Sequence, residues 1–208
     1  MKTWRRSLLL LTVTSALLLT GCTGGGSSAR SKLEAAQSVY RTMSGCTAQA
    51  EITADYGQRV YGYTVDLTVK GGSGVMTVKE PENLAGTVLT WSDGETQLAF
   101  DGTELDTGAL SDSGLSPADA MPTILTACQG GEIVDCCMEE QAGAQVLHST
   151  LDLDGDQGGQ IQCWFQPDSY GLLRAELSQD GVTVVTMQFS DFSFTFPEGG
   201  VEDSGGSQ

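Results

Sequence analysis

The chain is poor in the residues that build metal and catalytic sites. Its 208 residues include a single histidine, His148, so no histidine cluster exists for zinc. None of its six cysteines forms a Cys-x-x-Cys pair, the spacing on which many zinc and redox motifs depend. No glycine-rich loop leads from a strand into a helix, as nucleotide binding requires. We therefore expect a protein that is not an enzyme and has neither a metal site nor a cofactor.

Basic residues and long apolar runs are also scarce. Ten Lys and Arg residues stand against 27 Asp and Glu residues, giving a net charge of −17. Such a chain repels phosphate backbones, which excludes nucleic acid as a partner. Beyond the N-terminus no apolar run approaches the about 20 residues that a membrane-spanning helix needs.

The N-terminus has the order of an export signal. A basic start, residues 1–6, precedes an apolar run, residues 7–19, and small residues then lead into a cysteine as Leu19-Thr20-Gly21-Cys22. This order is typical of a secretory signal peptide, and its end resembles a lipobox. The sequence therefore predicts a lipoprotein signal peptide over 1–21 and lipid attached to Cys22. Two acyl chains, at about 0.8 kcal/mol per buried methylene, would hold the chain on the extracytoplasmic face of the cell membrane.

Cleavage before Cys22 would leave a more acidic chain with three parts. It removes three basic residues and no acidic one, so the net charge falls from −17 to −20. Residues 22–31 are expected to be the lipidated cysteine and a flexible Gly/Ser linker. Residues 32–196 are expected to form one domain. Residues 197–208 have little to bury and are expected to be disordered.

Five cysteines remain in the predicted domain, and this odd number leaves at least one thiol unpaired within the chain. They are Cys46, Cys128, Cys136, Cys137 and Cys163. Export permits disulfides, but the adjacent Cys136 and Cys137 would point to opposite faces of a strand. We expect most of these cysteines to be small buried apolar residues.

Hydrophobic periodicity predicts a helix followed by two runs of strands. Helical spacing of Leu33, Val39, Tyr40 and Met43 predicts an amphipathic helix over 31–44 that ends at Gly45, with Gln37 facing outward. Alternating apolar residues predict strands over 47–54, 61–69, 75–79, 87–91, 97–100, 133–138, 145–153, 160–166, 172–178 and 182–196. Ser116-Pro117 opens a second helix that continues to Cys128. The apolar face of the last strand changes register between Phe189 and Phe192, which predicts a bulge.

The order of these elements, with the turn Lys79-Glu80-Pro81-Glu82-Asn83-Leu84, resembles the LolA/LolB lipoprotein-carrier superfamily over residues 32–196. The turn is similar to the K-x-P-x-x-L turn of that superfamily. The resemblance implies an α+β fold in which helices cover a curved antiparallel sheet, an incomplete barrel, with acyl chains bound on its concave face. The candidate ligand-binding residues are Tyr40, Tyr61, Tyr63, Val65, Trp91 and Phe100. The alternative is that a set of mostly aromatic side chains simply fills a closed core against the helices: Tyr61, Tyr63, Val65, Trp91, Phe100, Trp164 and Phe189.

Two functions follow as expectations. The first is a membrane-anchored lipoprotein that binds a lipid or another hydrophobic ligand, with the helix over 31–44 as a lid if the site lies beneath it. The alternative is a lipoprotein like the Gram-positive GerS type, which binds and regulates an exported partner protein in spore germination or the cell envelope.

Two further sites are weighed and set aside. Residues 152–156 begin like a calcium loop, but Gln157 stands where the motif needs glycine and Cys163 where it needs glutamate. A solvated hairpin turn is the expectation there, and a calcium-dependent adhesion or sensing domain is a third, weaker hypothesis. His148 is expected at the edge or surface of a strand.

Overall fold

The structure, a computed structural model, describes residues 25–109, 115–152 and 159–197. Its strands form one antiparallel sheet in the order β6-β5-β4-β3-β2-β1-β11-β10-β9-β8-β7. The strands are β1 Gly45–Asp55, β2 Val60–Lys70, β3 Ser73–Glu80, β4 Val88–Ser92, β5 Glu95–Phe100, β6 Thr103–Ala109, β7 Glu132–Gln141, β8 Ala144–Asp152, β9 Gly159–Phe165, β10 Leu172–Gln179 and β11 Val182–Thr195. The helices are α1 Gly25–Thr42 and α2 Pro117–Gly130, with a short 3-10 turn, η1, at Glu82–Leu84.

The sheet consists of two meanders that meet at its centre. Strands β1 to β6 form one and β7 to β11 the other, and the pairing of β1 with β11 joins them. Strands β6 and β7 are the two ends of the strand order, so the curved sheet does not close into a barrel. The expected fold class, an α+β fold with a curved antiparallel sheet and covering helices, is confirmed.

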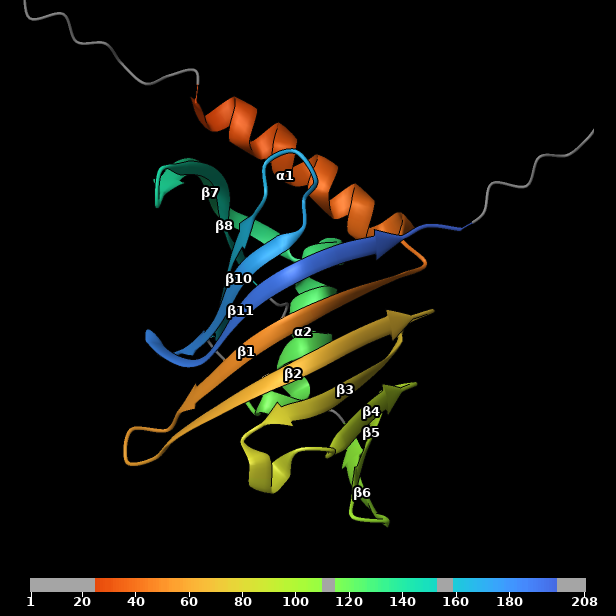
Figure 1. The fold of residues 1–208 in the computed structure, drawn as a ribbon. Coiled ribbons are helices and arrows are strands. Elements are labelled where there is room, and N and C mark those ends of the chain that lie inside the picture. The colour runs from red at the N-terminus through yellow and green to blue at the C-terminus, as the bar shows by residue number, and fades with distance from the viewer. Residues whose placement is uncertain (1–24, 110–114, 153–158, 198–208) are drawn as a thin grey trace, which may run out of the picture.

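The two helices lie on the side toward which the edges of the sheet curve. Figure 1 shows α2 behind the central strands, while α1 crosses one end of the sheet near β7 and β8. Helix α1 contacts α2, β7 and β8, and α2 contacts β1 and β8. No helix within the described ranges is both long and apolar enough to span a bilayer.

Alternation fixes which face of the central strands is buried. In β1 the inward residues Ala48, Ala50, Ile52 and Ala54 are at most 6% exposed, and the residues between them are exposed. The helices cover the apolar face of the sheet, while its polar face stays in water, as is common for antiparallel sheets.

Two local predictions are confirmed in detail. Thr47 pairs with Ser193 and Gln49 with Ser190, so β11 carries one extra residue, the bulge predicted between Phe189 and Phe192. At the start of α2 the Ser116 hydroxyl accepts a hydrogen bond from the Asp119 amide at 3.1 Å, which satisfies a free N–H of the first turn.

The N-terminal helix starts earlier than predicted. It begins at Gly25, so residues 25–31 are helical rather than a flexible linker, and it ends at Thr42, which leaves Gly45 to open β1. Glycine and serine are poor helix formers, but tertiary contacts stabilise the helix here. Ala29 is fully buried, and Lys32 donates to the Pro167 carbonyl at 3.1 Å. The predicted signal peptide, Cys22 and the tail beyond 197 lie outside the described residues.

Candidate functional site

A cavity of about 600 Å³ opens between the β1–β6 half of the sheet and the start of α2. Its lining is mostly aliphatic and aromatic. The lining residues are Ile52, Tyr63, Val65, Met76, Val78, Leu84, Thr87, Leu89, Leu98, Phe100, Asp101, Thr103, Leu105, Ser116, Pro117 and Ala118. Pockets for small-molecule ligands typically measure about 300–1,000 Å³ and have this apolar character.

Strand register explains why these residues share one face. Met76 of β3 pairs directly with Leu89 of β4, Leu89 with Leu98 of β5, and Leu98 with Leu105 of β6. Directly opposed residues in an antiparallel sheet point to the same side. The result is an apolar row that crosses four neighbouring strands and forms one wall of the cavity.

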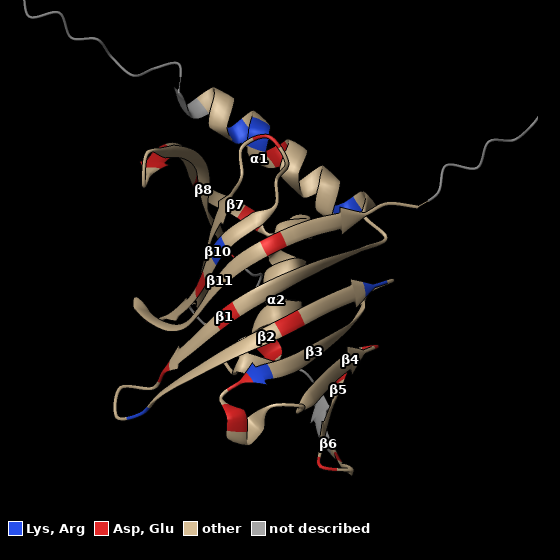
Figure 2. Cartoon of the chain, viewed as in Figure 1, with Lys and Arg blue, Asp and Glu red and all other residues tan. Residues whose placement is uncertain are grey.

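Among the described residues, Asp101 is the one charged residue that lines this cavity. Asp101 and Phe100 also line a second cavity of about 350 Å³, together with Glu82, Asn83, Ala85 and Gly86. Figure 2 shows acidic residues both in η1 and at the turn between β5 and β6. Because Asp101 and Glu82 are both acidic residues, a neutral or cationic polar group is favoured beside them over an anionic one.

Three of the six candidate ligand-binding residues line the large cavity, and three lie elsewhere. Tyr63, Val65 and Phe100 are lining residues. Tyr61 is 38% exposed and its ring contacts that of Tyr56 at a centroid distance of 6.1 Å. Trp91, which is 4% exposed, packs over Gly74 on the neighbouring strand. The sixth residue, Tyr40, belongs to the other end of the sheet.

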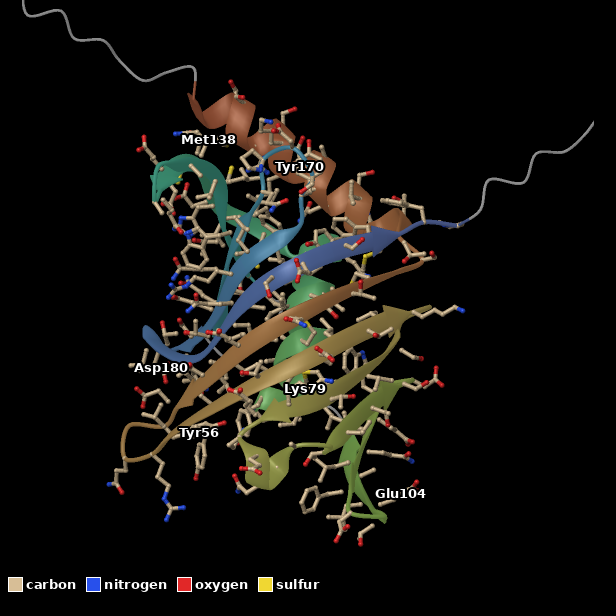
Figure 3. The ribbon with its side chains drawn as sticks, in the orientation of Figure 1. Tyr56, Lys79, Glu104, Met138, Tyr170 and Asp180 are labelled. Carbon is tan, nitrogen blue, oxygen red and sulfur yellow. The ribbon has the colours of Figure 1, made fainter. Side chains whose placement is uncertain are left out.

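Tyr40 lies in an aromatic cluster and does not line the large cavity. Its ring is fully buried and has edge contacts with Phe165 and Phe194 at centroid distances of 6.0 and 5.1 Å. Its hydroxyl donates to the Tyr170 carbonyl at 3.1 Å, in the β9–β10 loop that Figure 3 shows beside α1. Burial raises the Tyr40 pKa well above its ordinary value, so the hydroxyl stays protonated as a donor.

Helix α1 therefore packs on β7 and β8, and none of its described residues lines the cavity. The expected inward positions Leu33 and Tyr40 are buried, but Gln37, expected to face outward, is only 8% exposed. Its side-chain Nε2 donates to the Gly131 carbonyl at 2.9 Å, where α1 meets the end of α2. The lid role of residues 31–44 depended on a site beneath this helix, and the cavity is bordered by the start of α2 instead.

Most of the five cysteines in the predicted domain are buried, as expected. All five are free thiols; Cys46, Cys128 and Cys163 are buried, while Cys136 is half-buried and Cys137 is exposed. Burial raises the pKa of Cys46 to about 12, so its thiol stays neutral. The carboxylates of the calcium-like stretch beyond Asp152 lie in residues 153–158, outside the described ranges.

No known protein family and no curated protein matches this sequence. Among solved structures, the chain is similar to the lipoprotein LppX of Mycobacterium tuberculosis, with 12% identity and a TM-score of 0.48 over 83% of this chain and 97% of that one. It is similar to a putative outer membrane lipoprotein-sorting protein domain from Vibrio parahaemolyticus, with 12% identity and a TM-score of 0.46 over 86% and 94%. It is also similar to a LolA superfamily protein from Nitrosomonas europaea, with 11% identity and a TM-score of 0.42 over 82% and 94%.

Proposed function

We propose that this protein is a membrane-anchored extracytoplasmic lipoprotein that binds a lipid or another hydrophobic ligand without catalysing a reaction. The observation that carries the proposal is the cavity of about 600 Å³ with its apolar wall. Each Å² of apolar surface removed from water contributes about 25 cal/mol, so an acyl chain or a similar apolar group gains free energy by entering it.

The position of two exposed apolar side chains supports the same function. Phe100 and Leu105, at 41% and 56% exposure, line the cavity and also face solvent. Large apolar side chains that gather at an opening are typical of a ligand-binding surface. The acidic residue Asp101 in the lining favours a ligand whose polar end is neutral or cationic.

Filling the cavity should abolish ligand binding. Val78 faces the cavity from β3, whereas Val75 on the same strand does not line it and is 39% exposed. We expect Val78→Trp to remove the fluorescence enhancement of the neutral apolar probe N-phenyl-1-naphthylamine, because the indole occupies the space that the probe needs. Val75→Trp adds the same side chain outside the cavity and should leave probe binding unchanged.

Native mass spectrometry of the full chain purified from membranes would identify the ligand that it carries. Equal probe binding by the Val78→Trp and Val75→Trp variants would place the ligand outside this cavity. A wild-type chain that carries no lipid, binds no probe and retains one exported protein through purification would favour the GerS-type alternative of a partner-binding lipoprotein.

Anchoring rests on the lipobox-like Leu19-Thr20-Gly21-Cys22. Replacing Cys22 by alanine removes the thiol that would carry the lipid, so the precursor should remain uncleaved and take up no radioactive palmitate. Gel mobility and palmitate labelling of cells that express the two forms provide the measurement. Palmitate incorporation into the Cys22→Ala chain would exclude Cys22 as the attachment site.

A further inference from the structure

Three side chains with different metal-binding atoms converge on β7 and β8. Cys137 of β7 and His148 of β8 are directly opposed in the antiparallel register, and Glu139 lies two residues beyond Cys137, on the same face. The Cys137 Sγ lies 4.0 Å from the His148 Nδ1, and the Glu139 Oε2 lies 3.5 Å from that nitrogen. The three ligand atoms all lie within 4.8 Å of one another.

These separations are close to those of a tetrahedral zinc site. Zinc lies about 2.3 Å from sulfur and about 2.0–2.2 Å from imidazole nitrogen and carboxylate oxygen, which places neighbouring ligand atoms about 3.5 Å apart. The imidazole and carboxylate atoms already have this spacing. Since Cys137 is exposed, a small side-chain rotation brings its sulfur into range.

Neighbouring residues orient two of the three ligands. The His148 Nε2 lies 3.1 Å from the Gln162 Oε1. Because an amide oxygen only accepts hydrogen bonds, Nε2 is the ring nitrogen that donates to Gln162, and Nδ1 is the one that faces Cys137 and Glu139. The Trp164 indole and the Gln141 side chain both donate to the Glu139 Oε1, at 2.7 and 2.6 Å. The other oxygen, Oε2, faces the imidazole. Metal-binding histidines and carboxylates are characteristically held by such hydrogen bonds.

Stacking holds the imidazole in this orientation. The His148 ring lies parallel to the Trp164 ring, with an interplanar angle of 2° and a centroid distance of 4.4 Å. This contact explains why the histidine side chain is only 20% exposed, more covered than a surface position suggests.

We propose that Cys137, Glu139 and His148 bind a divalent transition-metal ion of the zinc type. Thiolate and imidazole ligands select zinc over magnesium and calcium. Binding transfers the Cys137 proton to solvent, leaves the sulfur as a thiolate bonded to the metal, and keeps the fourth position open to water. The site shares no residue with the apolar cavity, so the inference does not depend on the proposed lipid binding.

Metal binds the thiolate and not the thiol, so metal uptake should release the Cys137 proton and weaken as the pH falls.

The probe for this site is cobalt(II), which reports a bound thiolate through a charge-transfer absorption band in the near ultraviolet. The full-length chain carrying Cys22→Ala, which removes an unrelated thiol, should bind one equivalent of cobalt with this band, and zinc should displace it. Cys137→Ser and His148→Gln should each lose the band. Cys136→Ser is the matched control, because the adjacent side chain packs on the opposite, core-facing side, and it should keep the band.

Gln162→Leu tests the orienting role without touching a ligand. It should leave the band in place and weaken cobalt affinity by about ten- to hundredfold, while circular dichroism shows the same secondary structure. Absence of the band in the parent chain, or its persistence in Cys137→Ser, would overturn the proposal. An imidazole NMR signal of His148 that titrates with pH but does not respond to zinc would also overturn it, and would identify a simple ion pair with Glu139.

Discussion

Replacing Tyr40 by alanine is expected to lower the free energy of unfolding by about 3–5 kcal/mol, the usual cost of removing a fully buried aromatic ring. The ring contacts Phe165, Phe192 and Phe194 at centroid distances of 6.0, 6.3 and 5.1 Å, so its loss leaves a void between α1 and two strands. Urea denaturation followed by tryptophan fluorescence measures the change.

Tyr40→Phe separates packing from hydrogen bonding. It keeps the ring and removes only the bond to the Tyr170 carbonyl, so it should cost about 1 kcal/mol. Both variants, where folded, should bind N-phenyl-1-naphthylamine as the parent chain does, because Tyr40 does not line the cavity. If Tyr40→Phe binds the probe ten times more weakly, Tyr40 takes part in ligand binding, and its assignment to the aromatic cluster alone is wrong.

Hydrophobic periodicity was sufficient to predict the central strands, because buried and exposed residues alternate along them. Val65 and Leu67 of β2 are buried while their neighbours are more exposed, and a period of two records this directly. Strand β6, Thr103–Ala109, could not be predicted in this way. Its sequence has one large apolar residue, Leu105, and its pairing with β5 holds it at the edge of the sheet.

The binding site could be predicted only in part, since alternation gives the face of a residue but not what lies above it. Val65 and Trp91 both face the concave side and both are buried, yet only Val65 borders the cavity. The missed lining residues Met76, Leu89 and Leu98 alternate just as clearly. What distinguishes them is their cross-strand register, which aligns all three in one row.

The cluster of Cys137, Glu139 and His148 could not be predicted from the sequence either. Counting histidines argues against zinc, and no local spacing connects His148 with Cys137 and Glu139. Only the β7–β8 register places the cysteine opposite the histidine. Mixed sites whose ligands come from paired strands therefore become visible once pairing is known, while motifs confined to one short segment can be recognised in the sequence.

Gly74 and Trp91 form a matched pair across β3 and β4 whose coupling should be large. They are directly opposed, and a Cβ placed on Gly74 would lie 1.9 Å from Cζ2 of the Trp91 ring, so the indole would have to move out of a filled core. Gly74→Ala should therefore cost about 1–3 kcal/mol of stability, as overpacking does. Urea denaturation of the two single variants and the double variant measures the coupling.

The double-mutant cycle distinguishes this contact from a general intolerance of strand substitutions. Trp91→Leu alone should destabilise by leaving a void, but Gly74→Ala added to it should cost little, because the new methyl group enters the vacated space. Gly62→Ala in β2 is the control: a Cβ there meets nothing within 4 Å, so its effect should be small and, through lower entropy of the unfolded chain, favourable. Additive losses in the double variant would show that Gly74 is needed for its backbone conformation rather than for the space it leaves to Trp91.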